Sequence, residues 1–429
     1  AFASEGADAW FNSEPSRFLG NLPPDDYEQI TDILDVWFDS GSTHAFVVEN
    51  PIDPAWPSAA HADLYLEGSD QHRGWFQSSL LESCATRGRA PYDAVLTHGF
   101  VLDEQGRKMA KSLGNTISPQ KITDQNGAEI LRLWTASSDF TQDLRIGGEI
   151  IKGTVDGYRR LRNTIRFMLA NLSGFDDAER VSYDEMPELE RWLLARMAQI
   201  DAGVREGYAE FDFNRVYSQL FNFATNELSA FYFDIRKDAL YCDVKDSKRR
   251  RAARTAIDAL FTRVVTWLAP ILCFTMEEAW VTRFGDDSSV HLETFLTTPA
   301  EWANEELLAK WERIRSLRRL VTGALEIARR DKIIGASLEA APVLYVDAQK
   351  DADLFGESDL AELAITSSAR IEIGDGGPEA FRLADVAGAA TLFARAPGKK
   401  CGRCWIVLPE VGKHAKHDDL CNRCAEAVG

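Results

Sequence analysis

Four stretches between residues 151 and 330 repeat their apolar residues every three or four positions. The stripes consist of Leu189, Trp192, Leu193, Met197, Ile200 and Val204; of Val216, Tyr217, Leu220, Ala224, Leu228, Phe231 and Ile235; of Ile257, Leu260, Phe261, Val264, Val265 and Leu268; and of Leu307, Trp311, Ile314, Leu317, Val321 and Leu325. Such a repeat gives a helix one apolar face, which must pack against another to leave water. Residues 151–330 therefore predict an antiparallel helical bundle with its aromatic residues in the core.

The preceding region, residues 31–150, has an α/β pattern. Short apolar runs at 64–66 and 94–97 each end at a glycine-containing turn, and a helical stretch at 75–85 lies between them. Strands that alternate with helices are typical of a parallel sheet. Ligands bind beyond the carboxyl ends of such strands, so the residues that follow each run are candidates for ligand contacts.

The remaining segments are shorter. Residues 1–30 are mixed in composition and predict a connector without a core of its own. Residues 331–397 contain three strand-like runs, at 343–346, 371–373 and 391–393, punctuated by glycine and aspartate, which predict a small α+β module. Residues 398–429 form a cysteine-rich segment, and no internal repeat is visible in the sequence.

Four of the seven cysteines form two C-x2-C pairs near the end of the chain: Cys401, Cys404, Cys421 and Cys424. Two such pairs can close a tetrahedral four-thiolate zinc site, which leaves no position for water and is therefore structural. So short a segment cannot bury a useful core, and metal binding would supply its folding energy. Free or disulfide-paired cysteines are the alternative. Cys84, Cys242 and Cys273 stand in apolar surroundings and are expected in the core.

The net charge of −19 argues against a protein that binds nucleic acid indiscriminately, although local basic patches remain compatible with an RNA partner. One patch spans 245–254 and includes Arg249, Arg250 and Arg251, and another spans 315–332. A solvated helix face is the alternative for each. Basic residues near the cysteines, among them Arg403 and Arg423, are also compatible with contact to a phosphate backbone. No apolar run is long enough for a membrane span, and no secretory signal is visible.

Residues 106–115 read GRKMAKSLGN, a polar loop with two lysines and a glycine toward each end. By composition alone this is a soluble loop. Its core, Lys108-Met109-Ala110-Lys111-Ser112, resembles the lysine-rich signature loop of class I aminoacyl-tRNA synthetases, usually Lys-Met-Ser-Lys-Ser. The neighbouring blocks LDVWFDSGSTH (34–44), GSDQHRGWF (68–76), LTHGF (96–100) and GAEILRLW (127–134) are similar to those of bacterial isoleucyl-tRNA synthetases. The similarity continues in order through 158–172, 268–280, 334–340 and the cysteines.

This resemblance implies an organisation for the whole chain. Residues 1–30 would be a connector from an editing domain, and 31–150 the second half of a Rossmann-type catalytic domain. Residues 151–330 would be an anticodon-binding bundle, with Arg249, Arg250 and Arg251 as candidate tRNA contacts. Residues 331–397 would be a junction module, and 398–429 a zinc domain. The implied substrates are L-isoleucine, ATP with Mg²⁺, and tRNA(Ile), and the implied full-length protein is cytoplasmic and monomeric.

The resemblance also implies roles for individual residues. Lys108 and Lys111 would neutralise the pyrophosphate that leaves ATP, and positive charge that arrives in the transition state helps most. Ala110 replaces the usual serine and removes no charge. The ATP contacts would be Lys111, Gly68, Asp70, His98 and Gly99. The aminoacyl-adenylate contacts would be Glu67, Gln71, Trp37 and Trp75, the two indoles lining the isoleucine pocket.

Two parts of that family's pattern are not found in this sequence. No His-x-Gly-His motif occurs among the seven histidines, and no editing insertion is present. We therefore expect the 429-residue chain alone to activate isoleucine negligibly. The alternatives are a valyl or leucyl class I synthetase, and a non-enzymatic zinc-containing tRNA-binding protein in which the lysine loop is a relic.

Overall fold

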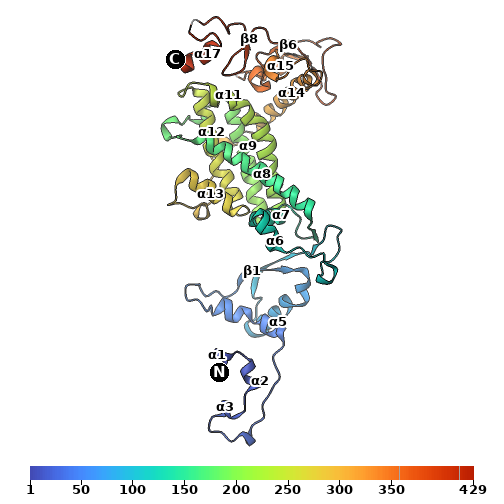
Figure 1. Cartoon of the computed structure of the whole chain (residues 1–429), viewed down its shortest axis with the longest axis vertical. Coiled ribbons are helices and arrows are strands. Elements are labelled where there is room, and N and C mark those ends of the chain that lie inside the picture. The colour runs from blue at the N-terminus through green and yellow to red at the C-terminus, as the bar shows by residue number, and fades with distance from the viewer. Residues whose placement is uncertain (357, 415) are drawn as a thin grey trace. The chain divides into compact units, whose positions relative to one another are not determined.

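The structure is a computed structural model that describes residues 1–356, 358–414 and 416–429. The chain divides into two compact units. Unit 1 consists of Ala1–Leu102 and Phe140–Leu144, and unit 2 consists of Asp103–Asp139 and Arg145–Gly429. The α/β pattern of the first part and the helical pattern of the second are both present, so the predicted multidomain α/β plus all-α fold class is confirmed (Figure 1).

Unit 1 contains the predicted strand–helix–strand arrangement. Strand β1 (Ala62–Gly68) pairs in parallel with β2 (Tyr92–His98), and helix α5 (Trp75–Arg87) lies between them in sequence. The register places Gly68 opposite His98, so the two strands end side by side. A short helix, α4 (Val36–Gly41), packs on α5. The predicted strands, helix and parallel pairing are therefore confirmed.

The remaining elements of unit 1 are short. Helices α1 (Phe2–Glu5), α2 (Asp8–Asn12) and α3 (Ser16–Leu19) precede the strands, as does a π-helical segment, η2 (His44–Glu49). A 3-10 turn, η3 (Ser69–Arg73), joins β1 to α5. The Phe18 ring contacts the rings of Phe2 and Trp10, so the first helices pack through a small aromatic group.

Unit 2 is built on the helical bundle that the apolar stripes predict. Three stripes form α9 (Glu188–Ala209), α12 (Lys248–Leu268) and α14 (Glu305–Arg330). The fourth forms one long helical stretch with three parts: α10 (Phe213–Asn222), a π-helical segment η7 (Phe223–Phe233), and α11 (Asp234–Cys242). Trp192, Phe231 and Trp311 are buried, as expected of core aromatics.

The bundle contains further helices outside the four stripes. These are α6 (Pro119–Asn126), α7 (Ala128–Ala136), α8 (Gly148–Leu172) and α13 (Cys273–Phe284). Helix α8 packs along α12, and α12 also contacts α9 (Figure 1). No helix in the described residues is long and apolar enough to span a bilayer.

The three strand-like runs near residue 345 form a small mixed sheet. Strand β5 (Val343–Val346) is central and pairs in parallel with β6 (Arg370–Ile373) and antiparallel with β7 (Ala389–Leu392). Helices α15 (Gln349–Asp353) and α16 (Leu360–Ala364) complete this module. Its apolar residues belong to the same core as the bundle, and α14 packs against both β7 and α16.

The cysteine segment forms a two-stranded hairpin followed by a helix. Strand β8 (Lys399–Lys400) pairs antiparallel with β9 (Val407–Leu408), and α17 (Asn422–Val428) follows. The other three cysteines do not all meet the expectation of burial. Cys242 is buried and Cys273 is partly buried, but Cys84 is exposed, so its predicted place in a core is wrong.

Candidate functional site

The residues predicted to contact ATP in unit 1 meet where β1 and β2 end. Gly68 is opposite His98, and a Cβ on Gly68 would lie 2.6 Å from Asp70 Oδ1 and 3.6 Å from His98 Cε1. The distance to His98 is an ordinary van der Waals contact, whereas a Cβ on residue 68 would force the Asp70 carboxylate to move away from the strand end. Glu67 is exposed, and its carboxylate accepts from the backbone N–H of Gly68 at 3.1 Å.

Gly99 is fixed by a segment that lies far away in the sequence. Its N–H donates to the carbonyl of Phe140 at 2.9 Å, and a Cβ on Gly99 would lie 2.3 Å from the backbone of Gln142. His98 Nδ1 donates to the Gly99 carbonyl at 2.8 Å. Nδ1 therefore carries a proton, and in the neutral ring Nε2 is left as an acceptor.

The two predicted pocket tryptophans lie on neighbouring elements, α4 and the start of α5. The Trp75 indole donates to the Ser40 carbonyl at 2.9 Å and stacks on Tyr65 at a centroid distance of 4.2 Å. Trp37 is 48% exposed, and its ring lies against Gly74, where a Cβ would be 2.9 Å from Trp37 Cη2. The two indoles therefore both lie at residues 74–75. About half of the Trp37 side chain is exposed and can contact a ligand.

Gln71 has a clear structural role at the same place. Its Oε1 accepts from the backbone N–H of Trp75 at 2.9 Å. The first N–H groups of a helix have no partner within the helix, so this bond satisfies one of them at the start of α5. Its amide nitrogen has no hydrogen-bond partner within the described part of the chain, so it can make the predicted contact to an aminoacyl group.

The lysine loop in unit 2 is held at its base by Asp103 and Asn115. Asp103 accepts from the backbone N–H groups of Gln105 and Arg107, from Arg107 Nε at 2.8 Å, and from Asn115 Nδ2 at 2.8 Å. Asn115 also donates to the Lys108 carbonyl and accepts from the Ala110 N–H at 2.9 Å. The Asn115 bond above all, with those from Arg107, lowers the pKa of Asp103 to about 2 despite burial.

Both lysine side chains of this loop are exposed. Lys111 begins the short turn η4 (Lys111–Leu113), and Gly114, which follows this turn, has a φ of 63° that favours glycine. A fixed base with exposed ammonium groups at the tip suits a loop that closes on an anionic ligand. The loop belongs to unit 2, whereas Glu67, Asp70 and His98 belong to unit 1.

The four predicted metal ligands come together. The Sγ atoms of Cys401, Cys404, Cys421 and Cys424 all lie within 4.8 Å of one another, and all four residues are buried. Cys404 Sγ and Cys421 Sγ are 3.8 Å apart. A tetrahedral zinc ion with Zn–S bonds of about 2.3 Å places its sulfurs roughly 3.8 Å apart, so these residues fit structural zinc.

Each cysteine pair also places an arginine against the end of α11. Arg403 donates to the carbonyls of Tyr241, at 3.1 Å, and Cys242. Arg423 pairs with Asp238, where Nη2 and Oδ1 are 2.7 Å apart, and with Asp243 at 3.1 Å. These two arginines therefore bind the helix end, which replaces the expectation that they face a phosphate backbone.

Cys242, on α11, packs with the four ligands in one buried cluster. Burial raises the pKa of its thiol to about 11. It therefore stays protonated at neutral pH, whereas a zinc ligand must be a thiolate. Arginine–carbonyl bonds, ion pairs and this thiol together join the cysteine segment to the bundle.

The three arginines predicted as tRNA contacts make internal bonds. Arg249 pairs with Asp243 at 2.8 Å, Asp238 at 3.1 Å and Glu362 at 2.9 Å. Arg250 and Arg251 donate to main-chain carbonyls, which for Arg251 are those of residues 178–180. Their contact with tRNA stays a prediction.

Three family models match successive parts of the chain. Residues 1–147 match the class I tRNA synthetases for I, L, M and V. Residues 190–345 match the anticodon-binding domain of tRNA ligases, and residues 398–427 match the zinc finger found in FPG and IleRS. The parallel strands, the lysine loop and the four-cysteine cluster thus define a class I aminoacyl-tRNA synthetase architecture with a zinc-binding segment.

Curated relatives specify the branch of that class. The isoleucine--tRNA ligase of Ruegeria pomeroyi is 57% identical over all of this chain, and those of Brucella abortus and Caulobacter vibrioides are 52% identical. The chain covers 44% of each relative's length. The chain therefore belongs to the isoleucine--tRNA ligase family.

A solved structure supports the fold. The ternary complex of Agrobacterium radiobacter K84 agnB2 LeuRS, tRNA and LeuAMS matches with a TM-score of 0.52 at 19% identity, covering 64% of this chain and 34% of that one. The valyl or leucyl alternative and the non-enzymatic alternative are not favoured, because the relatives that match the whole chain are isoleucine ligases.

Proposed function

We propose that this chain supplies part of the machinery that joins L-isoleucine to tRNA(Ile). The isoleucine carboxylate attacks the α-phosphorus of ATP, the bond to the β-phosphate oxygen breaks, and pyrophosphate leaves as isoleucyl-adenylate forms. The isoleucyl group is then transferred to tRNA. The proposal is supported above all by 52–57% identity to isoleucine--tRNA ligases over the whole chain.

Lys108 and Lys111 are proposed to act on the leaving pyrophosphate. Their side chains are exposed on a loop whose base is fixed by Asp103 and Asn115, so the ammonium groups can approach the phosphates without refolding the loop. Negative charge grows on the departing oxygens, and donors that meet it there lower the barrier. Mg²⁺ bound with ATP would share this task, held mainly by the phosphates.

The ends of β1 and β2 are proposed to hold the nucleotide and the aminoacyl group. Gly68, Asp70, His98 and Gly99, with Lys111, would contact ATP. Glu67, Gln71, Trp37 and Trp75 would contact the aminoacyl-adenylate. Isoleucine has one methylene more than valine. In an apolar pocket lined by tryptophan this methylene changes the binding free energy by about 1–3 kcal/mol, which is how the pocket favours isoleucine.

The remaining parts are proposed to serve tRNA and stability. The bundle, including Arg249, Arg250 and Arg251, would face tRNA(Ile). One zinc ion held by the four cysteines would be structural, because four thiolates leave no open position for substrate. The protein would act as a monomer in the cytoplasm.

Isoleucine-dependent exchange between ATP and pyrophosphate tests this proposal. In the gene product that contains this sequence, Lys108→Ala and Lys111→Ala should each lower the exchange rate by about 10²–10³-fold. Lys121→Ala, on α6, is a control that should change it little.

The 429-residue chain alone should show negligible exchange, because the sequence contains no His-x-Gly-His. Clear exchange by the chain alone would contradict its predicted incompleteness. An unchanged rate without both lysines would contradict the role assigned to the loop.

A further inference from the structure

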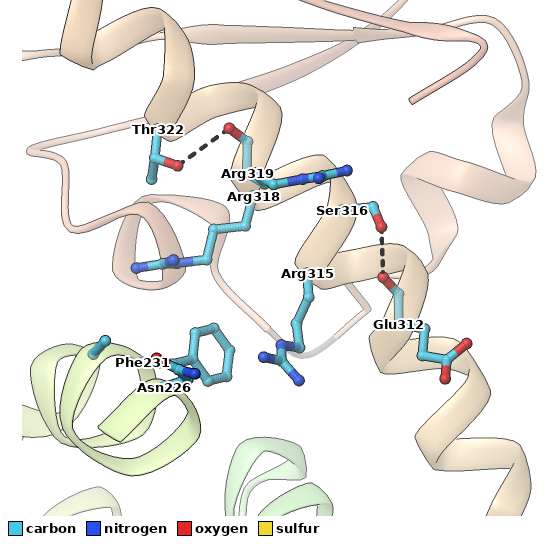
Figure 2. Close-up of a pocket in the computed structure, with 9 residues that line it drawn as sticks. Asn226, Phe231, Glu312, Arg315, Ser316, Arg318, Arg319 and Thr322 are labelled. Carbon is cyan, nitrogen blue, oxygen red and sulfur yellow. Dashed lines mark hydrogen bonds between the residues drawn. The ribbon is translucent and has the colours of Figure 1, made fainter. Parts of the chain in front are cut away.

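A cavity of about 600 Å³ lies between the π-helical segment η7 and helix α14 in unit 2, and its arginines have partners within the protein. Figure 2 shows Arg315 and Arg318 above Phe231, and their guanidinium carbons lie 5.2 Å and 5.1 Å from the centroid of its ring. Arg319 pairs with Asp385. The packing and charge pairing of the bundle therefore account for this cavity.

In unit 1, helix α4 packs on α5 through Gly41, the last residue of α4. A Cβ on this buried residue would lie 2.3 Å from Glu82 Oε1 and 3.1 Å from the carbonyl carbon of Ser78, both on α5. The first distance is far below van der Waals contact, and the second would press on the backbone of α5. Gly41 is not in the left-handed region, so lack of space, and not backbone conformation, favours glycine here.

Two side chains hold the C-terminal end of α4 at this contact. The carbonyl of Ser40 accepts from the indole N–H of Trp75 at 2.9 Å, and the carbonyl of Gly41 accepts from His44 Nδ1 at 3.0 Å. His44 is itself buried. The last carbonyls of a helix have no partner one turn further along the same helix, so these side chains supply two bonds and fix where α4 ends against α5.

The same contact places Trp37 relative to Trp75. Trp37 precedes Gly41 by four residues on α4, and positions i and i+4 lie on one face of a helix. The Trp37 ring lies against Gly74, where a Cβ would be 2.9 Å from Trp37 Cη2. Gly74 directly precedes Trp75, the first residue of α5. Two glycine contacts, at Gly41 and at Gly74, therefore set how far apart the two tryptophans are held.

We propose that Gly41 determines amino-acid specificity by positioning α4 against α5. The inference rests on the proposed function, in which Trp37 and Trp75 line the isoleucine pocket, and adds the residue that sets their separation. Dispersion contacts lose a quarter to a half of their strength over a gap of about 0.5–1 Å. A displaced Trp37 would therefore lose its contact with the methylene that distinguishes isoleucine from valine. Gly41 contacts no substrate in this proposal and acts as a positioning residue.

The test compares two glycine-to-alanine variants of the gene product that contains this sequence. Gly41→Ala adds a methyl group at the contact with Glu82, whereas Gly153→Ala adds one on α8, where a Cβ would meet no described atom within 4 Å. Isoleucine-dependent and valine-dependent exchange between ATP and pyrophosphate gives kcat/KM for each amino acid and KM for ATP. Circular dichroism checks the fold.

Gly41→Ala should lower the ratio of kcat/KM for isoleucine to kcat/KM for valine by at least about 5-fold, because loss of a whole methylene contact costs roughly 10–200-fold. The change should come mainly from a higher KM for isoleucine. KM for ATP, and the ratio in Gly153→Ala, should stay within about 2-fold of the unaltered protein. A merely structural role would lower kcat/KM for both amino acids alike and leave the ratio unchanged.

Glu82→Ala removes the carboxylate that lies nearest to the added methyl group. In the Gly41→Ala background it should restore part of the ratio, because the 3.1 Å contact with Ser78 is then the main one left. If Gly41→Ala does not fold, the double variant is compared with Glu82→Ala alone and should show the lower ratio of the two.

An unchanged ratio in Gly41→Ala, or equal ratios in the double variant and in Glu82→Ala, would overturn the assignment of Gly41 while leaving isoleucine activation standing. Absence of isoleucine-dependent exchange in the unaltered protein would contradict the proposed function and this inference together.

Discussion

The two units differ most in how much apolar surface they bury. Among the described residues of unit 1, the buried hydrophobic residues are Ala9, Tyr65 and Phe76. In unit 2 one continuous core extends from Leu133 on α7 to Val386 beside the small sheet. Strand residues Leu66 and Val95 of unit 1 are 52% and 37% exposed. Parallel strands are usually covered on both faces. The residues of unit 1 therefore do not cover both faces of their own two-stranded sheet.

The two units therefore fix their functional residues by different interactions. In unit 2 the bundle is stabilised by a large core and by buried ion pairs, such as Glu190 with Arg236. The positions in unit 1 depend on a few directed bonds, such as Trp75 to Ser40. Unit 2 should therefore tolerate changes in unit 1, and each unit should respond to its own substitutions.

The largest effect is expected where unit 2 has little apolar core, in the cysteine segment. Cys404→Ser should abolish zinc binding and unfold residues 398–429, because binding of structural zinc supplies about 10–16 kcal/mol in small zinc-finger peptides. Metal analysis and amide exchange on α17 measure this.

The matched control is Cys84→Ser, which replaces an exposed cysteine in unit 1. It should leave zinc content and exchange unchanged. Retention of one zinc ion and of protection in Cys404→Ser would show that the segment does not depend on the metal.

The next largest effect is expected in the bundle. Glu190 and Arg236 are 0% and 2% exposed, and Glu190 also accepts from the Tyr232 hydroxyl at 2.9 Å. Glu190→Gln should lower the free energy of unfolding of unit 2 by about 3–5 kcal/mol, because the buried Arg236 then keeps only the partly exposed Glu362 as a charged partner. Urea denaturation measures this change.

Glu326→Gln removes the partner of Arg329 in an exposed pair and serves as the control. Its cost should be at most about 0.5 kcal/mol. Similar costs for the two variants would mean that burial does not distinguish these pairs.

A smaller effect is expected in unit 1. Trp75→Phe removes the indole bond to Ser40 but keeps an aromatic ring against Tyr65, so it should weaken the docking of α4 by about 1 kcal/mol. Amide exchange at residues 36–41 should rise, while the urea transition of unit 2 stays in place. Trp37→Phe should have less effect, because the Trp37 indole N–H has no partner among the described residues. A shift of the unit 2 transition would contradict the separation of the units.

The smallest effect is expected in the lysine loop, where the change occurs only at acid pH. The pKa of Asp103 is lowered from 3.8 to about 2, so its stabilising bonds are fully present above about pH 4 and are lost as pH falls through about 2. Amide resonances of Gln105 and Arg107 should follow this change, whereas Asp103→Asn should abolish the transition. Asp124→Asn, which changes an exposed carboxylate on α6, should not. A midpoint near 4 would mean that the loop bonds do not stabilise the carboxylate.

Local pattern was sufficient to predict β1, α5, β2 and the helices of the bundle, because apolar period and turn residues act over a few positions. The cysteine spacing was likewise sufficient for the cluster. The pattern missed the roles of Asp103 and Asn115, which become visible only when the loop folds back on itself. It left Arg403 and Arg423 compatible with a phosphate contact, because a charge in the sequence does not reveal which partner it will meet.

The sequence by itself determined which elements form and which cysteines can share a metal, since both follow from spacing along the chain. Tertiary structure alone decided that the arginines beside those cysteines bind the end of α11. The physical reason is that hydrogen bonds and ion pairs depend on distance in space, and the partners here are separated by 162 and 185 positions in the sequence.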